Sequence, residues 1–133
     1  MVRFCEKLAL GFENTKYAEP YASKIVLTGN PVRDMVHQVA DKPYPPLGPE
    51  HDVRMVVFGG SQGAQVFSNV LPGAIAALPV ELRSRLKLVQ QCREEDLQRM
   101  AEVYAQARVS VEAAPFFKDL PRLISNSHLV ISR

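Results

Sequence analysis

Short apolar runs alternate with helical stretches along most of the chain. Five runs are nearly continuous in aliphatic or β-branched residues, which is typical of strands buried on both faces of a parallel sheet. They are KIVLTG (24–29), VRMVVFGG (53–60), LKLVQQC (86–92), ARVSVEAA (107–114) and HLVISR (128–133). Strands and helices in this alternation predict right-handed βαβ crossovers, and therefore an α/β fold with a parallel sheet and flanking helices.

Three helices are expected between the last four runs. One follows GGSQG and should be kinked or restarted by Pro72. A second covers EEDLQRMAEVYAQA (94–107), with its acids in the first turn, where the helix dipole favours them. A third, shorter helix covers KDLPRLISN (118–126). The apolar face of the first helix would consist of Phe67, Val70, Leu71, Ile75 and Leu78.

The stretch ADKPYPPLGPEHD (40–52) interrupts this alternation. Its four prolines allow neither a helix nor a central strand. We expect an ordered surface loop or a linker, in which Tyr44 packs against the protein.

Composition places the chain among globular proteins, with 133 residues, 47% of them hydrophobic and 23% charged. A net charge of +2 with interspersed signs gives no case for nucleic acid as a partner. Cys5 and Cys92 are expected to be reduced thiols of a cytosolic protein, a long-range disulfide being the alternative. No run approaches the roughly 20 apolar residues of a membrane span, so we expect a soluble or at most peripheral protein. The three histidines fall in unrelated segments, and no metal site is expected.

The stretch VVFGGSQGAQ (56–65) combines a strand end, a glycine-rich turn and a helix start. Such a turn can hold a phosphate against the first amides of the helix. Its glycines match neither the dinucleotide-binding nor the Walker A spacing. In the simplest interpretation, Ser61 only caps the helix.

The same turn also matches the Gly-x-Ser-x-Gly elbow of serine hydrolases. Asp96 or Asp119, and then His128, follow in the order of a hydrolase triad. However, His128 begins a strand that looks buried, whereas a triad histidine needs a loop above the sheet. Nucleophilic catalysis by Ser61 is therefore the less favoured hypothesis.

The stretch TGNPVRDM (28–35) has the residues of a second helix start, with Asn30 as N-cap and Pro31 as first helical residue. Arg33 would then lie in the first turn, where a cation opposes the helix dipole. A nearby anion would resolve that conflict, and pairing with Asp34 or a distant carboxylate is the alternative. Together with the glycine turn, Arg33 makes a plausible diphosphate site.

Six segments carry a family resemblance: TGNPVR, FGGSQGAQ, LPGAIAALP, QQCREED, PFFKDLP and HLVISR. In this order and spacing, the chain resembles the MurG family of bacterial cell-wall N-acetylglucosaminyltransferases over nearly its whole length. The resemblance implies part of a two-domain GT-B glycosyltransferase with Rossmann-like sheets. Residues 1–33 would be the tail of the N-terminal acceptor domain and the interdomain segment. Residues 34–133 would be the first half of the C-terminal domain, which binds the UDP-sugar.

The resemblance also implies a reaction and a site. N-acetylglucosamine would pass, with inversion, from UDP-N-acetylglucosamine to lipid I, giving lipid II for peptidoglycan synthesis. The full-length family works peripherally at the cytoplasmic face of the bacterial inner membrane and needs no cofactor or metal. Arg33 and Ser61, with less certainty Gln62, and the turn glycines Gly60 and Gly63 would bind the donor diphosphate. The backbone at Phe117 would read uracil, and no residue is assigned as catalytic base.

The family's acceptor loop would precede Met1, and its ribose- and sugar-binding residues would follow Arg133. We therefore expect the chain alone to lack transferase activity, to bind UDP weakly at best, and to self-associate through its uncovered last strand. Three classes stay open: a piece of a glycosyltransferase donor domain, a serine hydrolase, and a non-catalytic nucleotide-binding or interaction fragment.

Overall fold

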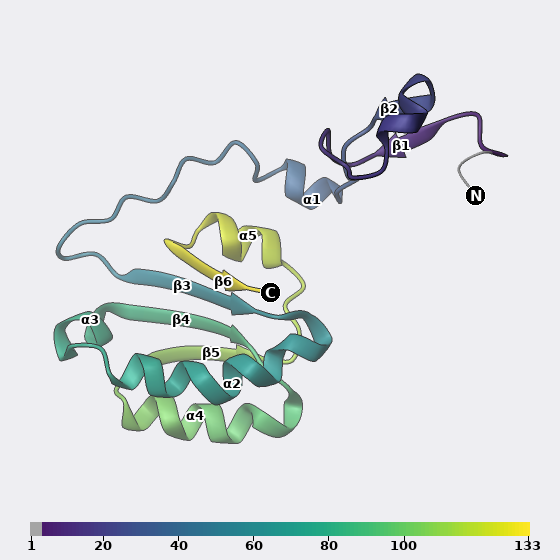
Figure 1. Cartoon of the computed structure of the whole chain (residues 1–133). Helices are drawn as coiled ribbons and strands as arrows, with labels where there is room; N and C mark the ends of the chain where they lie inside the picture. The colour runs from purple at the N-terminus through teal and green to yellow at the C-terminus, as the bar shows by residue number, and fades with distance from the viewer. Residues whose placement is uncertain (1–3) are drawn as a thin grey trace. The chain divides into compact units, whose positions relative to one another are not determined.

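The computed structural model describes residues 4–133, apart from the side chains of residues 61–64. The chain divides into two compact units, Met1–Asp34 and Met35–Arg133 (Figure 1). Among the described residues, no helix has the length and apolar character needed to cross a bilayer.

The first unit contains a small parallel sheet. Strands β1 (Leu8–Leu10) and β2 (Ile25–Leu27) pair with Leu8 opposite Ile25. The 3₁₀ helix η2 (Glu19–Lys24) leads into β2. β2 lies inside the run KIVLTG, as predicted, whereas β1 and η2 were not predicted.

The helix expected from Asn30 begins later. α1 covers Asp34–His37, so Arg33 precedes the helix and does not lie in its first turn. The side chain of Asn30 lies against Gly11, so closely that a Cβ on Gly11 would be 2.2 Å from Asn30 Oδ1. Because Asn30 packs on the end of the small sheet, the predicted N-cap is wrong. The first helical turn instead carries the acid Asp34, which suits the helix dipole.

The second unit is built on a parallel sheet of four strands in the order β5-β4-β3-β6. The strands are β3 (Val53–Phe58), β4 (Leu86–Gln91), β5 (Ser110–Ala114) and β6 (Leu129–Ser132). All four lie within the predicted runs. The predicted α/β architecture with a parallel sheet is therefore confirmed.

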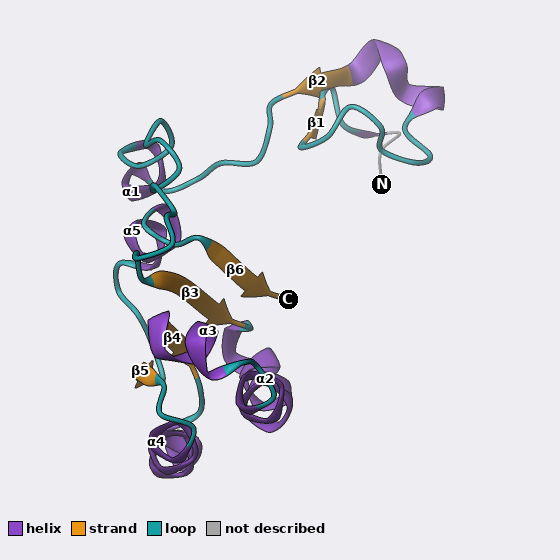
Figure 2. Ribbon diagram, turned by 90° about the vertical axis from the view of Figure 1, so that its left-hand side faces the viewer, coloured by secondary structure: helices purple, strands orange, loops and turns teal. Residues whose placement is uncertain are grey.

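Helices cover the two faces of this sheet unequally. α2 (Gly60–Ala76) and α4 (Leu97–Gln106) lie on one face, and the shorter α5 (Leu120–Ser125) lies on the other (Figure 2). The 3₁₀ turn η3 (Glu94–Asp96) precedes α4, and α3 (Val80–Arg85), which was not predicted, leads into β4. The core between sheet, α2 and α4 includes Met55, Val57, Leu71, Ile75, Leu88, Met100 and Tyr104.

Among the described strands of this sheet, only β3, one of the two interior strands, is buried on both faces. In β3, the consecutive residues Met55, Val56 and Val57 are all buried. In β4, buried Leu86 and Leu88 flank exposed Lys87. The expectation of strands buried on both faces is therefore correct for β3 and wrong for β4. It is also wrong for β2, β5 and β6, in which no residue is buried.

α2 continues through Pro72, where a kink or a restart was expected, and the helix does not restart. Pro72 has no N–H, so the carbonyl of Ser68, four residues earlier, lacks its intrahelical donor. Arg99 of α4 supplies the missing donor, with Nη1 3.2 Å from that carbonyl. The same guanidinium donates to Asn69 Oδ1 at 3.3 Å and pairs with Asp96. A side chain from the neighbouring helix thus stabilises α2 at its proline.

We expect Arg99→Ala to lower the free energy of unfolding by about 1–2 kcal/mol, because the Ser68 carbonyl loses its donor. In a Pro72→Ala background the same substitution should cost less, since the amide restored at position 72 bonds that carbonyl. Urea unfolding of the unmodified chain, the two single variants and the double variant measures the coupling energy between positions 72 and 99. We expect a coupling energy of about 1 kcal/mol.

The matched control for this cycle is Arg122→Ala. Arg122 also pairs with an acid three residues earlier, Asp119, but both side chains are largely exposed and no other helix is involved. Its loss should change the free energy of unfolding by less than about 0.5 kcal/mol. Strict additivity of Arg99→Ala and Pro72→Ala would show that the guanidinium does not substitute for the missing amide.

Candidate functional site

The loops at the carboxyl ends of the strands lie at one edge of the second unit's sheet. The glycine turn follows β3, residues 92–95 follow β4, and residues 115–119 follow β5. From β3 the chain first builds β4 and β5 on one side and then returns to add β6 on the other. Ligands of open α/β sheets bind where the strand order switches in this way. The glycine turn therefore lies at the position where a ligand is expected.

The backbone of the turn requires glycine and leaves helix amides available. Gly60 has φ +65°, which favours glycine, and a Cβ there would meet nothing within 4 Å. The helix is assigned from Gly60, after Gly59. The interpretation of Ser61 as a capping residue concerns a side chain outside the described ones and stays a prediction. The first turn of α2 contains no acid. Its first N–H groups thus face no carboxylate of their own turn and suit an anion.

A shallow pocket of about 320 Å³ adjoins this turn. The Gln91 side chain donates from Nε2 to the Pro115 carbonyl at 3.0 Å, and the Cys92 N–H donates to the Ala114 carbonyl at 3.1 Å. These bonds tie the end of β4 to the loop that follows β5. The pocket is lined by Gly60, Gln91, Cys92, Arg93, Glu94, Glu95 and Pro115.

Two titratable groups, Cys92 of the pocket lining and the buried Tyr104 of α4, are uncharged at neutral pH. Burial and the nearby Asp96 raise the pKa of the Cys92 thiol, against a smaller opposing effect of Arg99, so the thiol stays protonated at neutral pH. Tyr104 is fully buried and donates its hydroxyl to Gln90 Oε1 at 2.6 Å. Burial, and to a lesser degree Cys92, raise the pKa of this tyrosine as well. The described residues include no group of three or more potential metal ligands.

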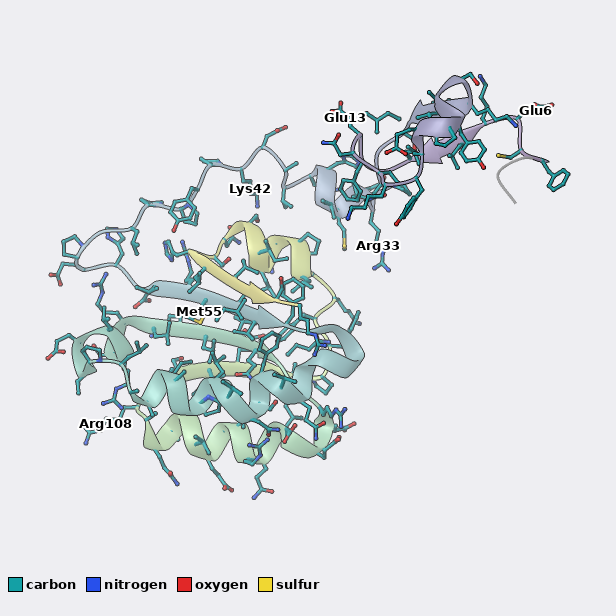
Figure 3. All side chains as sticks on the ribbon, viewed as in Figure 1. Glu6, Glu13, Arg33, Lys42, Met55 and Arg108 are labelled. Atoms are coloured by element: carbon teal, nitrogen blue, oxygen red, sulfur yellow. The ribbon has the colours of Figure 1, made fainter. Side chains whose placement is uncertain are left out.

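The predicted site residues fall in both units. Gly60 and Phe117 follow β3 and β5, and the spacing of strands puts these two strand ends about 10 Å apart, with β4 between them. Ser61, Gln62 and Gly63 lie outside the residues whose side chains are described. Arg33 belongs to the first unit, where its side chain is exposed (Figure 3). Joint binding of a diphosphate by Arg33 and the glycine turn stays a prediction.

Sequence reasoning did not single out the pocket residues Gln91 and Arg93. QQCREED contributed only to the family resemblance, although polar residues directly after a buried strand were a usable signal. Arg93 lies on the rim, with Nη1 3.5 Å from Glu95 Oε1.

His128 lies at the wrong end of the sheet for a catalytic triad with Ser61. Its N–H donates to the Arg54 carbonyl at the start of β3, whereas the glycine turn follows the other end of that strand, roughly 15–20 Å away. Its ring nitrogens also have structural partners: the Arg54 N–H donates to Nδ1 at 2.9 Å, and Nε2 lies 3.3 Å from the Pro46 carbonyl. Because Nδ1 accepts, the proton sits on Nε2, which is the reverse of what a triad requires.

The two candidate triad acids are also engaged elsewhere. Asp119 pairs with Arg122 at 2.7 Å, and Asp96 pairs with Arg99. Tyr44 fixes the strand start further, since its hydroxyl donates to the His128 carbonyl at 3.0 Å and its ring packs edge-on against the imidazole. The serine hydrolase alternative is therefore not supported. Tyr44 contacts the protein through His128, as predicted, but the residue stays 66% exposed.

Comparisons with known proteins agree on one family. The family model described as "Glycosyltransferase family 28 C-terminal domain" matches residues 54–133. Curated relatives carry the name UDP-N-acetylglucosamine--N-acetylmuramyl-(pentapeptide) pyrophosphoryl-undecaprenol N-acetylglucosamine transferase. The relative from Chelativorans sp. (strain BNC1) is 53% identical, over 86% of this chain and 30% of its own length. The relative from Methylobacterium sp. (strain 4-46) is 46% identical, over 100% of this chain and 36% of its own.

A solved structure gives the same result. The crystal structure of Acinetobacter baumannii MurG superposes with a TM-score of 0.66 at 26% identity, covering 99% of this chain and 34% of that one. The chain thus spans about a third of the length of the proteins it matches.

A fluorophosphonate probe, which labels activated serines, should not react with Ser61. The histidine that would activate this serine is held at the opposite edge of the sheet by its bonds to Arg54 and Pro46. Intact-mass spectrometry of the treated chain and of Ser61→Ala measures the labelling. Covalent modification that disappears in Ser61→Ala would restore the hydrolase hypothesis.

Gly60→Ala should lower the free energy of unfolding by about 1–2 kcal/mol, because a residue with a Cβ is disfavoured at this positive φ while space around it is free. Gly73→Ala is the matched control: Gly73 lies inside α2, has equally open surroundings and no positive φ. Alanine there should instead stabilise the chain by about 0.5–1 kcal/mol. Equal effects of the two substitutions in urea unfolding would show that the Gly60 backbone conformation is not required.

Proposed function

Because the chain belongs to the glycosyltransferase family 28 C-terminal domain family, we propose that its second unit binds the UDP moiety of UDP-N-acetylglucosamine. In the longer protein, this unit would serve an inverting N-acetylglucosaminyltransferase that converts lipid I to lipid II. The curated relatives' names specify such a transferase. The whole reaction is proposed for a protein about three times as long as this chain.

The observation that carries this proposal is the start of α2. A 17-residue helix begins directly after a central parallel strand, at a glycine with positive φ, with no acid in its first turn. These features provide unpaired amides and a favourable dipole for a diphosphate. The loop with Phe117 follows β5, which is the second strand from β3 in the sheet, so a nucleotide could extend from the glycine turn to that loop.

Each predicted residue has a distinct role in this proposal. The amides of the glycine turn and the Ser61 hydroxyl would stabilise the negative charge on the departing UDP, while Ser61 itself attacks nothing. Gln62 and Gly63 belong to the same turn, and Arg33 would add a cation from the first unit. The backbone at Phe117 would read the uracil edge. The muramyl 4-hydroxyl of lipid I would attack the anomeric carbon of the sugar.

The cellular setting follows from this assignment. Lipid I is embedded in the membrane, so the longer enzyme would work peripherally at the cytoplasmic face of the bacterial inner membrane. For the present chain, we propose weak binding of UDP, no transfer activity and self-association through β6. β6 is an edge strand, and its Leu129 is 47% exposed.

Titration of the full chain with UDP, followed by NMR, tests the nucleotide site. We expect shifts in the glycine turn and near Phe117, and weaker binding of UMP, which lacks the second phosphate. Arg33→Ala should weaken UDP binding about tenfold, as expected for one lost charge-assisted hydrogen bond. Ser61→Ala should weaken it less, because a neutral hydroxyl contributes less than a guanidinium.

Lys42→Ala is the control for charge alone, because Lys42 is an exposed cation of the proline-rich loop. UDP binding that survives Arg33→Ala unchanged would show that Arg33 takes no part in the diphosphate site. Absence of any UDP-induced shift in the glycine turn would contradict the proposed function of the second unit.

A further inference from the structure

A second pocket lies at the opposite edge of the sheet from the glycine turn. It is formed by α3, which leads into β4, and by the end of α4, which leads into β5. Its volume is about 390 Å³, and no acidic residue lines it. The lining residues are Val80, Arg83, Ser84, Gln106, Ala107 and Arg108.

Arg108 occupies a backbone position that favours glycine. The Val109 N–H bonds to the Tyr104 carbonyl at 2.9 Å, and the Arg108 N–H bonds to the Ala105 carbonyl at 3.0 Å. This is the Schellman pattern that ends many helices, and Arg108 is its left-handed residue, with φ +57°. An arginine here carries a steric cost that glycine would avoid, so the position is not chosen for stability.

A cation near the end of a helix is favoured by the helix dipole, but Arg83 already provides one. Its Nη1 donates to the carbonyl of Ala107, the last residue of the α4 end, at 3.2 Å. The dipole therefore gives no reason for a second guanidinium at position 108. The Arg108 side chain is exposed and belongs to the pocket lining, and among the described residues it has no hydrogen-bond or ion-pair partner (Figure 3).

Arg83 has unused donors as well. Its Nε is shielded from solvent and finds no acceptor among the described residues. A shielded N–H without a partner is unfavourable, and such groups in native proteins call for an explanation. That nitrogen is out of a ligand's reach, but Arg83 lines the pocket, so its other guanidinium N–H groups can donate to a ligand with anionic oxygens.

We propose that this pocket binds a small organic anion, a phosphate monoester or a carboxylate, that carries a compact apolar group. The two guanidiniums would hold the charged group, since planar forks of donors match phosphate and carboxylate oxygens. Val80 and Ala107 would contact the apolar group. The volume suits a ligand smaller than a nucleotide-sugar.

The site is separate from the proposed nucleotide site. The glycine turn lies at the carboxyl ends of the strands, and this pocket lies at the amino ends of β4 and β5, with the ten-residue α4 between the two edges. Such a helix is about 15 Å long. Both ligands could therefore be bound at once, and the inference does not depend on the glycosyltransferase assignment.

NMR titration of the full chain with phenyl phosphate, and separately with benzoate, tests this site. We expect at least one probe to shift the amides of residues 80–85 and 106–109, with inorganic phosphate binding at least fivefold more weakly. UDP should not displace either probe. Arg108→Gly should weaken binding at least fivefold while raising Tm by about 2–5 °C, because glycine relieves the left-handed conformation.

The gain in stability makes Arg108→Gly decisive, because weaker binding cannot then result from unfolding. Arg108→Lys keeps the charge without the fork and should lose less affinity than Arg108→Gly, while Lys42→Gln should bind as the unmodified chain does. Any of four results would overturn the proposal. The first two are unchanged binding in Arg108→Gly and amide shifts confined to residues 59–63 and 92–95. The others are equal affinity for inorganic phosphate and the absence of a shift with either probe.

Discussion

Parallel strand pairing is the constraint on which the arrangement of the second unit depends. Every neighbouring pair in the sheet is parallel, so the chain must cross back to the same edge before each new strand. As a result, one edge collects the turns that start α2 and α4, and the other edge collects the ends of α3 and α4. The amides that begin α2 and the guanidiniums of Arg83 and Arg108 are therefore separated by the length of the sheet.

The long elements could be predicted from the sequence because their pattern is local. The strands of the second unit and α2, α4 and α5 each show an apolar run or a helical period. β1 spans three residues, too few for a period to be visible. The helix start at Asn30 was predicted wrongly because a contact with Gly11, distant in sequence, takes the side chain that would have capped it.

The candidate site could likewise be predicted only in part, where its residues are consecutive in the sequence. The glycine turn is visible in the sequence, because its chemistry lies in consecutive residues. The nearby contact of Gln90 with the Tyr104 hydroxyl is not visible in the sequence, because it joins a buried residue of β4 to one of α4. Arg99 and the Ser68 carbonyl show the same dependence between elements, as does the bond between His128 and Arg54. In each case a polar group is satisfied across elements, which fixes how the elements pack.

The pairing of β6 with β3 also has a consequence for the order of folding. Arg54 and His128, bonded at the start of this pair, are 74 positions apart, whereas β3 with β4 and β4 with β5 are joined through single crossovers. Closing the longer loop costs more chain entropy, so the β3-β4-β5 core with α2 and α4 should form first and β6 should dock last. Until then, one side of the central strand β3 is an open template, and any competing strand of the same or another chain can occupy it. His128, at the start of β6, accepts a hydrogen bond from the Arg54 N–H of β3 through its imidazole. This bond would fix the register of β6 on β3 and would favour the correct strand over its competitors.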